Sequence, residues 1–257
     1  MSGLSIVIPA YNEEANVAGT VREVSDIAGQ LSMKYEIMVV NDGSTDRTAE
    51  IVRCLAQEIP LLKLVEHYPN RGYGAALKAG FAAASNELIA FIPADGQFLF
   101  SEIDRFLERI PTADIVCGYR VNRQDNPIRR LNGWGWNALV RLLFGCPCRD
   151  VDCGFKLLRR EVVEQVPMPS DGAMIDTELL AGARARGFRI AEVPVTHLPR
   201  VAGEATGAKP AVILKAFREL LRFRLRLSRE TRMANGQTRP RPASCPHPVT
   251  GSSESAR

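Results

Sequence analysis

Residues 86–100 read NELIAFIPADGQFLF, and this stretch decides the fold. The apolar run 88–92 predicts a buried strand of the kind found in parallel sheets, and it stops at Pro93. Asp95 and Gln97 follow, and because side chains two residues apart in an extended segment project to the same side, their oxygen atoms can reach one hard divalent cation. Pro, Asp and Gly are also the residues that an ordinary turn requires, so these residues alone leave a plain strand-ending turn open.

Length and composition indicate one globular α/β domain with appendages. The chain has 257 residues, of which 46% are hydrophobic and 24% charged, enough to bury a full core. No run approaches the roughly 18 apolar residues of a membrane span, and the N-terminus has neither the basic nor the apolar region of a signal peptide, so we expect a cytoplasmic protein. A net charge of +4 is too small to indicate a nucleic-acid partner, and none is expected.

The six cysteines agree with a reducing compartment. Cys54 and Cys117 stand in apolar sequence and are expected in the core. Cys146, Cys148 and Cys153 could be interpreted as a metal cluster, but a fourth ligand is missing and the spacing fits no zinc site. Buried thiols are therefore expected instead.

Three strand and helix units precede residue 86, each with a polar motif where its strand ends. The expected strands are 4–8, 35–40, 61–65 and 88–92, and the expected helices after the first three are 12–28, 45–58 and 75–84. Asn12 is expected to cap the first helix, with Glu13 and Glu14 in its first turn. This succession predicts a mostly parallel, doubly wound α/β sheet with right-handed crossovers, whose ligands bind at the carboxyl ends of the strands.

Two common nucleotide-binding motifs are absent from the sequence. PAYNEE follows the first strand where a dinucleotide-binding dehydrogenase would have Gly-x-Gly-x-x-Gly. No Gly-x-x-x-x-Gly-Lys-Ser/Thr segment indicates a P-loop. The sequence therefore favours a nucleotide held by scattered residues at strand ends together with a metal ion.

Four ordered motifs carry a resemblance to a known family: IVIPAYNEE (6–14), VVNDGSTDRT (39–48), NRGYGAALKAG (70–80) and PADGQF (93–98). Together they resemble glycosyltransferase family 2, the inverting enzymes of GT-A fold that take sugars from nucleotide diphosphates. GYRVNR (118–123), RDVDCGFKLLRR (149–160) and RVAGEATGAK (200–209) are similar to the dolichol- and polyprenol-phosphate sugar transferases. The resemblance runs from residue 4 to residue 209 and implies one GT-A domain over 1–228, with a nucleotide-sugar half (1–97), an acceptor half (98–209) and a basic helix (210–228).

The resemblance also implies roles for single residues. Those that match the nucleoside-binding positions are Pro9, Tyr11, Glu13, Val40, Asp42 and Ala94. Within this set, Glu13 would face the ribose, and Asp42 would contact the base or the ribose. Taken singly, each polar residue has a structural alternative, such as a helix cap or a turn, but all of them belong to one edge of one sheet.

The resemblance implies Mg²⁺ or Mn²⁺ bound by Asp95 and Gln97. Pro93 stands where the family usually has a first aspartate, which leaves two protein ligands to be completed by diphosphate and water. Arg120 and Arg200 match cations that neutralise the departing diphosphate. Lys209 is a looser match, because the GEATGAK segment displaces it towards the C-terminus.

Two amphipathic helices are expected in the second half of the chain. One starts at Asn126-Pro127 and carries Trp134 and Trp136 among arginines; the other covers 210–227 with a basic face. Each of these helices can either pack on the domain or lie at the surface of an anionic lipid bilayer. Residues 229–257 are rich in Arg, Pro, Ser and Gly and are expected to be a disordered tail.

The predicted function is inverting transfer of a hexose, mannose or glucose, from GDP-mannose or UDP-glucose to a polyprenyl phosphate, by an enzyme peripheral to the cytosolic membrane face. Asp95 and Arg200 would stabilise the leaving diphosphate. An anionic phosphate acceptor needs no base, whereas a hydroxyl acceptor does, and Asp176, then Glu178, are the candidates, unless they are only charges at a helix N-terminus. Two alternatives stay open: transfer to a saccharide or small-molecule hydroxyl, and a nucleotide-sugar-binding module without turnover.

Overall fold

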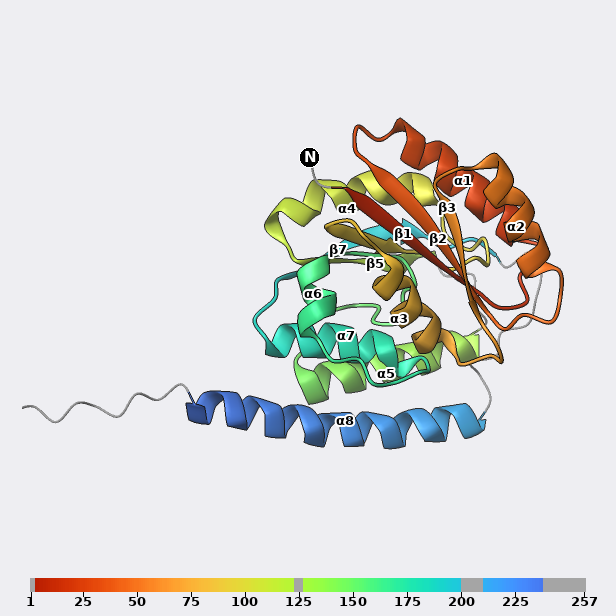
Figure 1. Ribbon diagram of the computed structural model, residues 1–257. Helices are drawn as coiled ribbons and strands as arrows, with labels where there is room; N and C mark the ends of the chain where they lie inside the picture. The colour runs from red at the N-terminus through yellow and green to blue at the C-terminus, as the bar shows by residue number, and fades with distance from the viewer. Residues whose placement is uncertain (1–2, 123–126, 200–209, 238–257) are drawn as a thin grey trace, which may run out of the picture.

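The apolar runs of the sequence form one seven-stranded sheet with helices on both sides (Figure 1). The computed structural model describes residues 3–122, 127–199 and 210–237, and the side chains among them except those of 127–129, 210–216 and 231–237. The strand order is β3-β2-β1-β4-β6-β5-β7.

The first half of the chain builds the parallel part of the sheet. Its elements are β1 (Leu4–Ala10), α1 (Val17–Gln30), β2 (Tyr35–Asp42), α2 (Thr48–Glu58), β3 (Leu62–His67), α3 (Tyr73–Ala83) and β4 (Leu88–Phe91). β1 pairs in parallel with both β2 and β4, and β2 pairs in parallel with β3. The four strands therefore bring their carboxyl ends to one edge, as the sequence predicts.

The second half extends the sheet less regularly. Its elements are α4 (Ile103–Arg109), β5 (Ile115–Val121), α5 (Pro127–Phe144), β6 (Lys156–Arg159), α6 (Arg160–Gln165), α7 (Met174–Ala185), β7 (Ile190–Thr196) and α8 (Pro210–Gln237). β6 runs antiparallel between β4 and β5. Its amino end therefore lies at the same edge as the carboxyl ends of the parallel strands.

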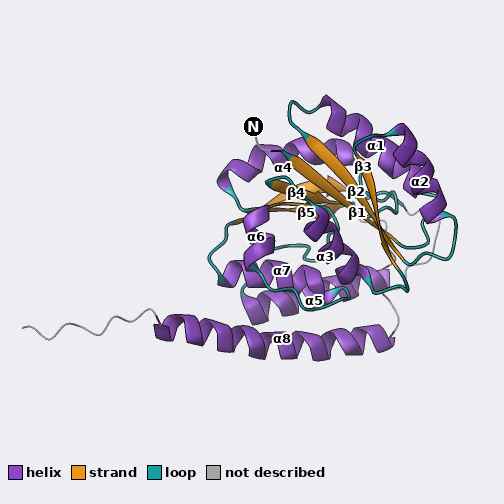
Figure 2. Ribbon diagram, viewed as in Figure 1, coloured by secondary structure: helices purple, strands orange, loops and turns teal. Residues whose placement is uncertain are grey.

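Two hydrophobic cores lie on the two faces of the sheet. One packs α1, α2 and α4 against it and the other packs α3, α6 and α7, with α5 and α8 outside α7 (Figures 1 and 2). Phe91 and Phe155, one in each core, are fully buried, and burying such a side chain contributes about 2–3 kcal/mol. The sheet is thus held rigidly between two apolar layers, which fixes the positions of its strand ends.

Several local predictions were wrong. α1 begins at Val17 rather than at Asn12, and α2 at Thr48, because the intervening loops bind each other: Asn12 N donates to Ser44 Oγ (3.0 Å) and Thr45 N donates to Asn12 Oδ1 (2.8 Å). Asn12 therefore joins two loops instead of capping a helix.

Two further corrections concern the expected core and tail. Cys54 is exposed on α2, whereas the thiols of Cys117, Cys146, Cys148 and Cys153 are free and buried, as expected. α8 continues to Gln237, so residues 229–237 are helical rather than part of a tail. The rest of the expected tail lies outside the described residues.

Candidate functional site

The carboxyl ends of β1, β2 and β4 bring the expected nucleoside-binding residues together. Pro9 lies opposite Val40 in the β1–β2 register, and Ala94 N donates to Pro9 O (3.2 Å). Tyr11, one residue beyond β1, is 45% exposed, so its ring can contact a ligand. Glu13 is half-buried, and its carboxylate accepts from Asn16 Nδ2 (2.8 Å). These residues form an apolar floor with a polar rim at one sheet edge.

The Asp42 carboxylate is bound by protein groups. Its Oδ1 accepts from Arg71 N (3.1 Å) and lies 2.7 Å from His67 Nδ1, and its Oδ2 accepts from Gly72 N (2.7 Å). Gly72 has φ of 103°, which favours glycine and lets its N–H face the carboxylate. Asp42 thus fixes the loop before α3. The sequence reasoning missed His67, whose only signal was its place where the third strand ends.

The loop after β4 carries the expected cation ligands and is tied to the segment after β7. Gln97 N donates to Asp95 Oδ1 (3.2 Å), which closes a turn on the Asp95 carboxylate. Gln97 Nε2 donates to Leu198 O (3.1 Å), and Leu198 N donates to Gln97 O (2.9 Å). The structure therefore sets Gln97 beside the residue that stands two positions before Arg200. Arg200 and Lys209 themselves lie outside the described residues.

Arg120 forms a buried ion pair. Its Nε and Nη2 atoms each lie 2.7 Å from the carboxylate of Asp150, and both side chains are buried. Burial opposes the charge, but the hydrogen bonds and charge of Asp150 hold the pKa of Arg120 above its ordinary value. A bidentate carboxylate thus already neutralises the guanidinium, a partner that the sequence did not indicate, and the role of Arg120 towards the diphosphate stays a prediction.

A second buried ion pair lies on β6 and α7. Lys156 Nζ lies 2.6 Å from Asp176 Oδ1, the lysine is fully buried, and its ammonium also donates to Cys153 O. Burial works against this charge, yet Asp176 keeps the pKa of Lys156 above its ordinary value. Asp176 is therefore held by a structural partner and is a poor base.

Asp152 lies between these two pairs in the sequence and differs from them. Its side chain is exposed by area although protein surrounds it on most sides. Partial desolvation, followed by the negative charges of Asp176 and Asp150, raises the pKa of Asp152 to about 7. A carboxylate in this state is one that a cation would stabilise.

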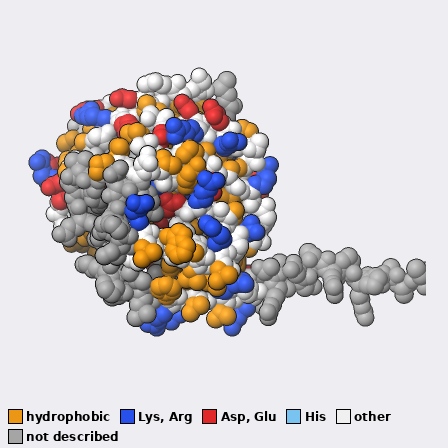
Figure 3. Space-filling model, turned by 180° about the vertical axis from the view of Figure 1, so that it is seen from behind, with side chains coloured by type: hydrophobic (Ala, Val, Ile, Leu, Met, Phe, Trp, Pro, Cys, Tyr) orange, Lys and Arg blue, Asp and Glu red, His pale blue; other side chains and the backbone are white. Residues whose placement is uncertain are grey.

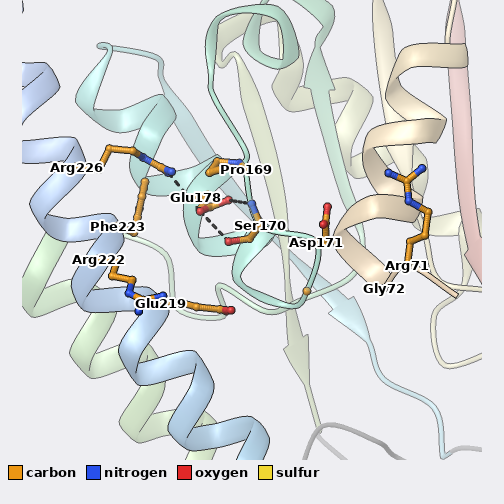
Figure 4. Close-up of a pocket in the computed structure, with 11 residues that line it drawn as sticks. Arg71, Gly72, Pro169, Ser170, Asp171, Glu178, Glu219, Arg222, Phe223 and Arg226 are labelled. Atoms are coloured by element: carbon orange, nitrogen blue, oxygen red, sulfur yellow. Dashed lines mark hydrogen bonds and ion pairs between the residues drawn. The ribbon is translucent and has the colours of Figure 1, made fainter.

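Glu178, the second base candidate, lines a pocket of about 570 Å³ between α3, α7 and α8 (Figure 4). The carboxylate accepts from Ser170 N (3.0 Å) and Ser170 Oγ (2.9 Å) and pairs with Arg226 Nη2 (3.3 Å). Glu178 is almost fully buried. It therefore fastens the 169–172 loop to α8 and is not open to an acceptor hydroxyl.

The donor set of the 93–97 loop fits a hard cation. A carboxylate from Asp95 and an amide oxygen from Gln97 are ligand types that Mg²⁺ and Mn²⁺ accept alongside substrate phosphates. In the described part of the chain, no group of three His, Cys, Asp or Glu side chains is arranged to hold a metal. A cation here would thus need ligands beyond acidic clusters, such as Gln97 and the substrate diphosphate.

Comparison with known proteins agrees with this geometry. The family model described as glycosyl transferase family 2 matches residues 5–166. The chain belongs to glycosyl transferase family 2.

Relatives of this glycosyl transferase family 2 chain include two kinds of polyprenyl-phosphate enzyme. The chain is 34% identical over 211 residues to the dolichyl-phosphate beta-glucosyltransferase ALG5C of Trichomonas vaginalis, covering 74% of this chain and 62% of the relative. It is 34% identical over 205 residues to the undecaprenyl-phosphate 4-deoxy-4-formamido-L-arabinose transferase of Aeromonas hydrophila, covering 79% and 62%. The chain thus matches about 62% of the length of these relatives.

A solved structure confirms the predicted GT-A fold. Glucosyl-3-phosphoglycerate synthase from Mycobacterium tuberculosis, determined with Mn²⁺, UDP and glucosyl-3-phosphoglycerate, superposes with a TM-score of 0.69 at 20% identity, covering 86% of this chain and 80% of the synthase. None of the helices in the described residues is long and apolar enough to cross a membrane.

Proposed function

We propose that this chain transfers a hexose from a nucleotide-diphosphate sugar to a polyprenyl phosphate. The observation that carries the proposal is the similarity to enzymes whose names give dolichyl phosphate and undecaprenyl phosphate as acceptors. The two carboxylates that the sequence offers as bases are held by protein groups, Asp176 by buried Lys156 and Glu178 by Ser170 and Arg226. An acceptor hydroxyl needs a base, whereas an anionic phosphate can attack without one, so these pairings agree with a phosphate acceptor.

In this proposal, each group of site residues binds a different part of the donor. Pro9, Val40 and Ala94 form the floor for the nucleoside. Asp95 and Gln97 would hold Mg²⁺ or Mn²⁺, which neutralises charge on the leaving diphosphate when bound. Two hydrogen bonds join Gln97 to Leu198, one from the Gln97 side chain and one between backbone groups, and they keep the segment that leads to Arg200 beside this loop. Arg200 and Lys209 would then add positive charge there.

The test is product analysis with matched acceptors. The full chain is incubated with UDP-glucose or GDP-mannose, Mn²⁺ and either a polyprenyl phosphate or the corresponding free polyprenol. We expect a lipid-linked hexose only with the phosphate, and the preferred donor identifies the nucleotide and the sugar. Transfer to the polyprenol or to a saccharide would replace the proposal with a hydroxyl-acceptor enzyme, and donor binding without any product would identify a binding module.

We also propose that the enzyme works on a bilayer surface, through what we call the α5–α8 apolar face. Six of the nine exposed large hydrophobic side chains in the described residues lie on these two helices. They are Leu131, Trp134, Leu142, Phe217, Leu221 and Leu225. On α8 they are four residues apart and so form one stripe.

Contacts between the helices make this face continuous. The rings of Trp136 and Phe217 lie 5.9 Å apart and those of Phe144 and Phe223 lie 5.1 Å apart, so α5 and α8 run side by side. Figure 3 shows hydrophobic side chains gathered low on the rear face, with Lys and Arg side chains beside them. Among the described side chains of the two helices, the exposed arginines are Arg130, Arg141, Arg218, Arg222, Arg224 and Arg229.

An anionic lipid surface suits this combination of side chains. Apolar residues enter the interface, and each arginine near anionic lipid contributes about 1 kcal/mol. α5 contains no acidic residue that would oppose this attraction. We assign the face to the cytosolic leaflet, because the free thiols of the described residues are typical of a reducing compartment.

Vesicle sedimentation tests the surface. The double variant Leu221→Glu/Leu225→Glu should bind phosphatidylglycerol vesicles at least tenfold more weakly than the wild type, whereas Leu61→Glu, an exposed leucine on another part of the chain, should bind like the wild type. Vesicles of pure phosphatidylcholine should bind the wild type and the variants weakly. Equal binding by all variants would refute the lipid assignment, and a change from dimer to monomer in the double variant would assign the face to a second copy instead.

A further inference from the structure

The segment 152–154 lies directly beside the loop that carries the cation ligands. In the antiparallel β4–β6 register, Phe91 is opposite Lys156. Continuing the register by two residues pairs Pro93 with Gly154, and the two are in contact: a Cβ built on Gly154 would lie 2.6 Å from Pro93 Cγ. The absence of a side chain at Gly154 therefore lets the proline ring rest on this segment.

Asp95 and Asp152 each stand two residues beyond that contact. Two residues of chain span at most about 7 Å, so each of the two residues lies within about that distance of the Pro93–Gly154 contact, and in the antiparallel register both lie on the same side of it.

Asp152 is also the carboxylate in this region that protein groups leave open. Asp150 is bound by Arg120 and Asp176 by Lys156. Asp152 makes no hydrogen bond or ion pair with the described residues, and its side chain is exposed.

We propose that Asp152 is a second carboxylate ligand of the catalytic divalent cation and compensates for the aspartate that Pro93 replaces. The proposal rests on the proposed function, because that function supplies the cation. Asp95, Gln97 and Asp152 then offer three oxygen ligands, and the remaining positions are left for diphosphate and water, the arrangement that Mg²⁺ and Mn²⁺ favour in nucleotide sites. The ligand set of this chain is thus distributed over β4 and the loop before β6.

Direct measurement of Mn²⁺ binding tests the assignment without activity. Electron paramagnetic resonance of free Mn²⁺ is recorded with the wild type, Asp152→Asn and Asp171→Asn, each with and without UDP. Asp171 is an exposed carboxylate paired with Lys78 and serves as the control. We expect Asp152→Asn to weaken Mn²⁺ binding about ten- to hundredfold, Asp171→Asn to leave it unchanged, and melting temperatures to stay equal.

A rescue variant sharpens the test. Pro93→Asp combined with Asp152→Asn should recover most of the lost Mn²⁺ affinity, because the double variant moves the carboxylate from residue 152 to residue 93 in the adjacent segment. Mn²⁺ affinity within twofold of the wild type in Asp152→Asn would overturn the proposal, and so would failure of the wild type to bind Mn²⁺ with UDP. A loss of turnover at unchanged Mn²⁺ affinity would assign Asp152 to proton transfer. Normal Mn²⁺ binding without transfer to polyprenyl phosphate would reject the proposed function alone.

Discussion

Carboxylates at the two ends of the sheet differ in how many hydrogen bonds they accept from the protein. At the amino end, Glu36 on β2 is buried and accepts hydrogen bonds from Ser5 Oγ (2.7 Å), Ser85 N (2.6 Å) and Lys63 Nζ (2.8 Å), among others. At the carboxyl end, Asp152 has no such donor among the described residues, and Asp95 is bonded within its own turn to Gln97 N. We call the amino end closed, because protein donors surround Glu36, and the carboxyl end open, because Asp152 has no donor among the described residues.

This difference separates structural from functional acidic residues. A buried carboxylate that is fully hydrogen-bonded contributes to folding, because its donors replace water. Desolvation and the charges of Asp176 and Asp150 make the Asp152 carboxylate harder to keep charged, and a bound cation would offset this cost. The carboxyl end also contains two structural pairs, Arg120 with Asp150 and Lys156 with Asp176.

The largest effect is expected for Asp176→Asn, which breaks the buried pair beneath the open end. Lys156 would keep its charge without a partner, so the free energy of unfolding should fall by about 3–5 kcal/mol. Urea denaturation measures this loss. The double variant Lys156→Met/Asp176→Leu should recover most of the stability, because it removes both charges. An unchanged stability of Asp176→Asn would mean that the carboxylate is not bound by Lys156, and would restore it as a base candidate.

Asp95→Asn should show the reverse pattern, with a large loss of activity and little loss of stability. A neutral amide binds a hard divalent cation far more weakly than a carboxylate does, so turnover should fall by about a hundred- to a thousandfold. Steady-state kinetics over a range of Mn²⁺ concentrations measures the loss, and thermal melting checks that the fold is intact. Turnover at the wild-type rate in the presence of a chelator would contradict the metal assignment.

Glu36→Gln tests the closed end. The variant replaces charge-assisted hydrogen bonds from Ser5, Ser85 and Lys63 with weaker neutral ones, so we expect a loss of about 2–3 kcal/mol in unfolding free energy. The rate of the folded enzyme should not change, because Glu36 lies at the far end of the sheet from the site. A change in the Michaelis constant for the donor sugar would show that the two ends are not independent.

The pH dependence of stability should reveal the same residue. Burial by itself would raise the pKa of Glu36, but hydrogen bonds from Lys63, Ser85 and Ser5 outweigh it and lower the pKa from 4.5 to about 2. Because the folded pKa is depressed, its contribution is complete above pH 4.5 and is lost as the pH falls towards 2. Urea midpoints of the wild type and Glu36→Gln should therefore converge on acidification from pH 6, and parallel curves would contradict this account.

From the sequence, the position of the polar residues at the carboxyl end of the sheet can be predicted, but the buried ion pairs near them cannot. Strand ends followed by polar residues place Asp95 at the correct edge, because parallel strands share one carboxyl edge. Lys156 and Asp176 are 20 residues apart, and nothing in either local pattern indicates that β6 reverses direction and buries the lysine against α7. The ion pair of Arg120 was missed for the same reason, since its partner Asp150 follows 30 residues later.

Loop contacts were equally invisible in the sequence. Asn12 has the composition of a helix cap, but its partners Ser44 and Thr45 come from a loop more than thirty residues away. His67 has no local motif and gains its role only because β3 lies beside β2. Local propensity therefore predicts the elements, whereas the side-chain pairs depend on which elements become neighbours.

The smallest expected effect concerns which hydrogen-bond donor to Glu36, Lys63 or Ser85, contributes more to the free energy of unfolding. The Lys63 side chain is 59% exposed, and an exposed ion pair contributes at most about 1 kcal/mol, whereas Ser85 donates to Glu36 Oε1, the oxygen that also accepts from buried Ser5. Lys63→Met should therefore cost less than about 1 kcal/mol and still less in high salt, while Ser85→Ala should cost about 1–2 kcal/mol at any salt concentration. Urea denaturation of both variants, alone and combined with Glu36→Gln, gives each coupling energy from a double-mutant cycle. If Lys63→Met proves as costly as Glu36→Gln, the closed end depends on a surface charge, and the contrast with the open end would lie in charge pairing rather than in burial.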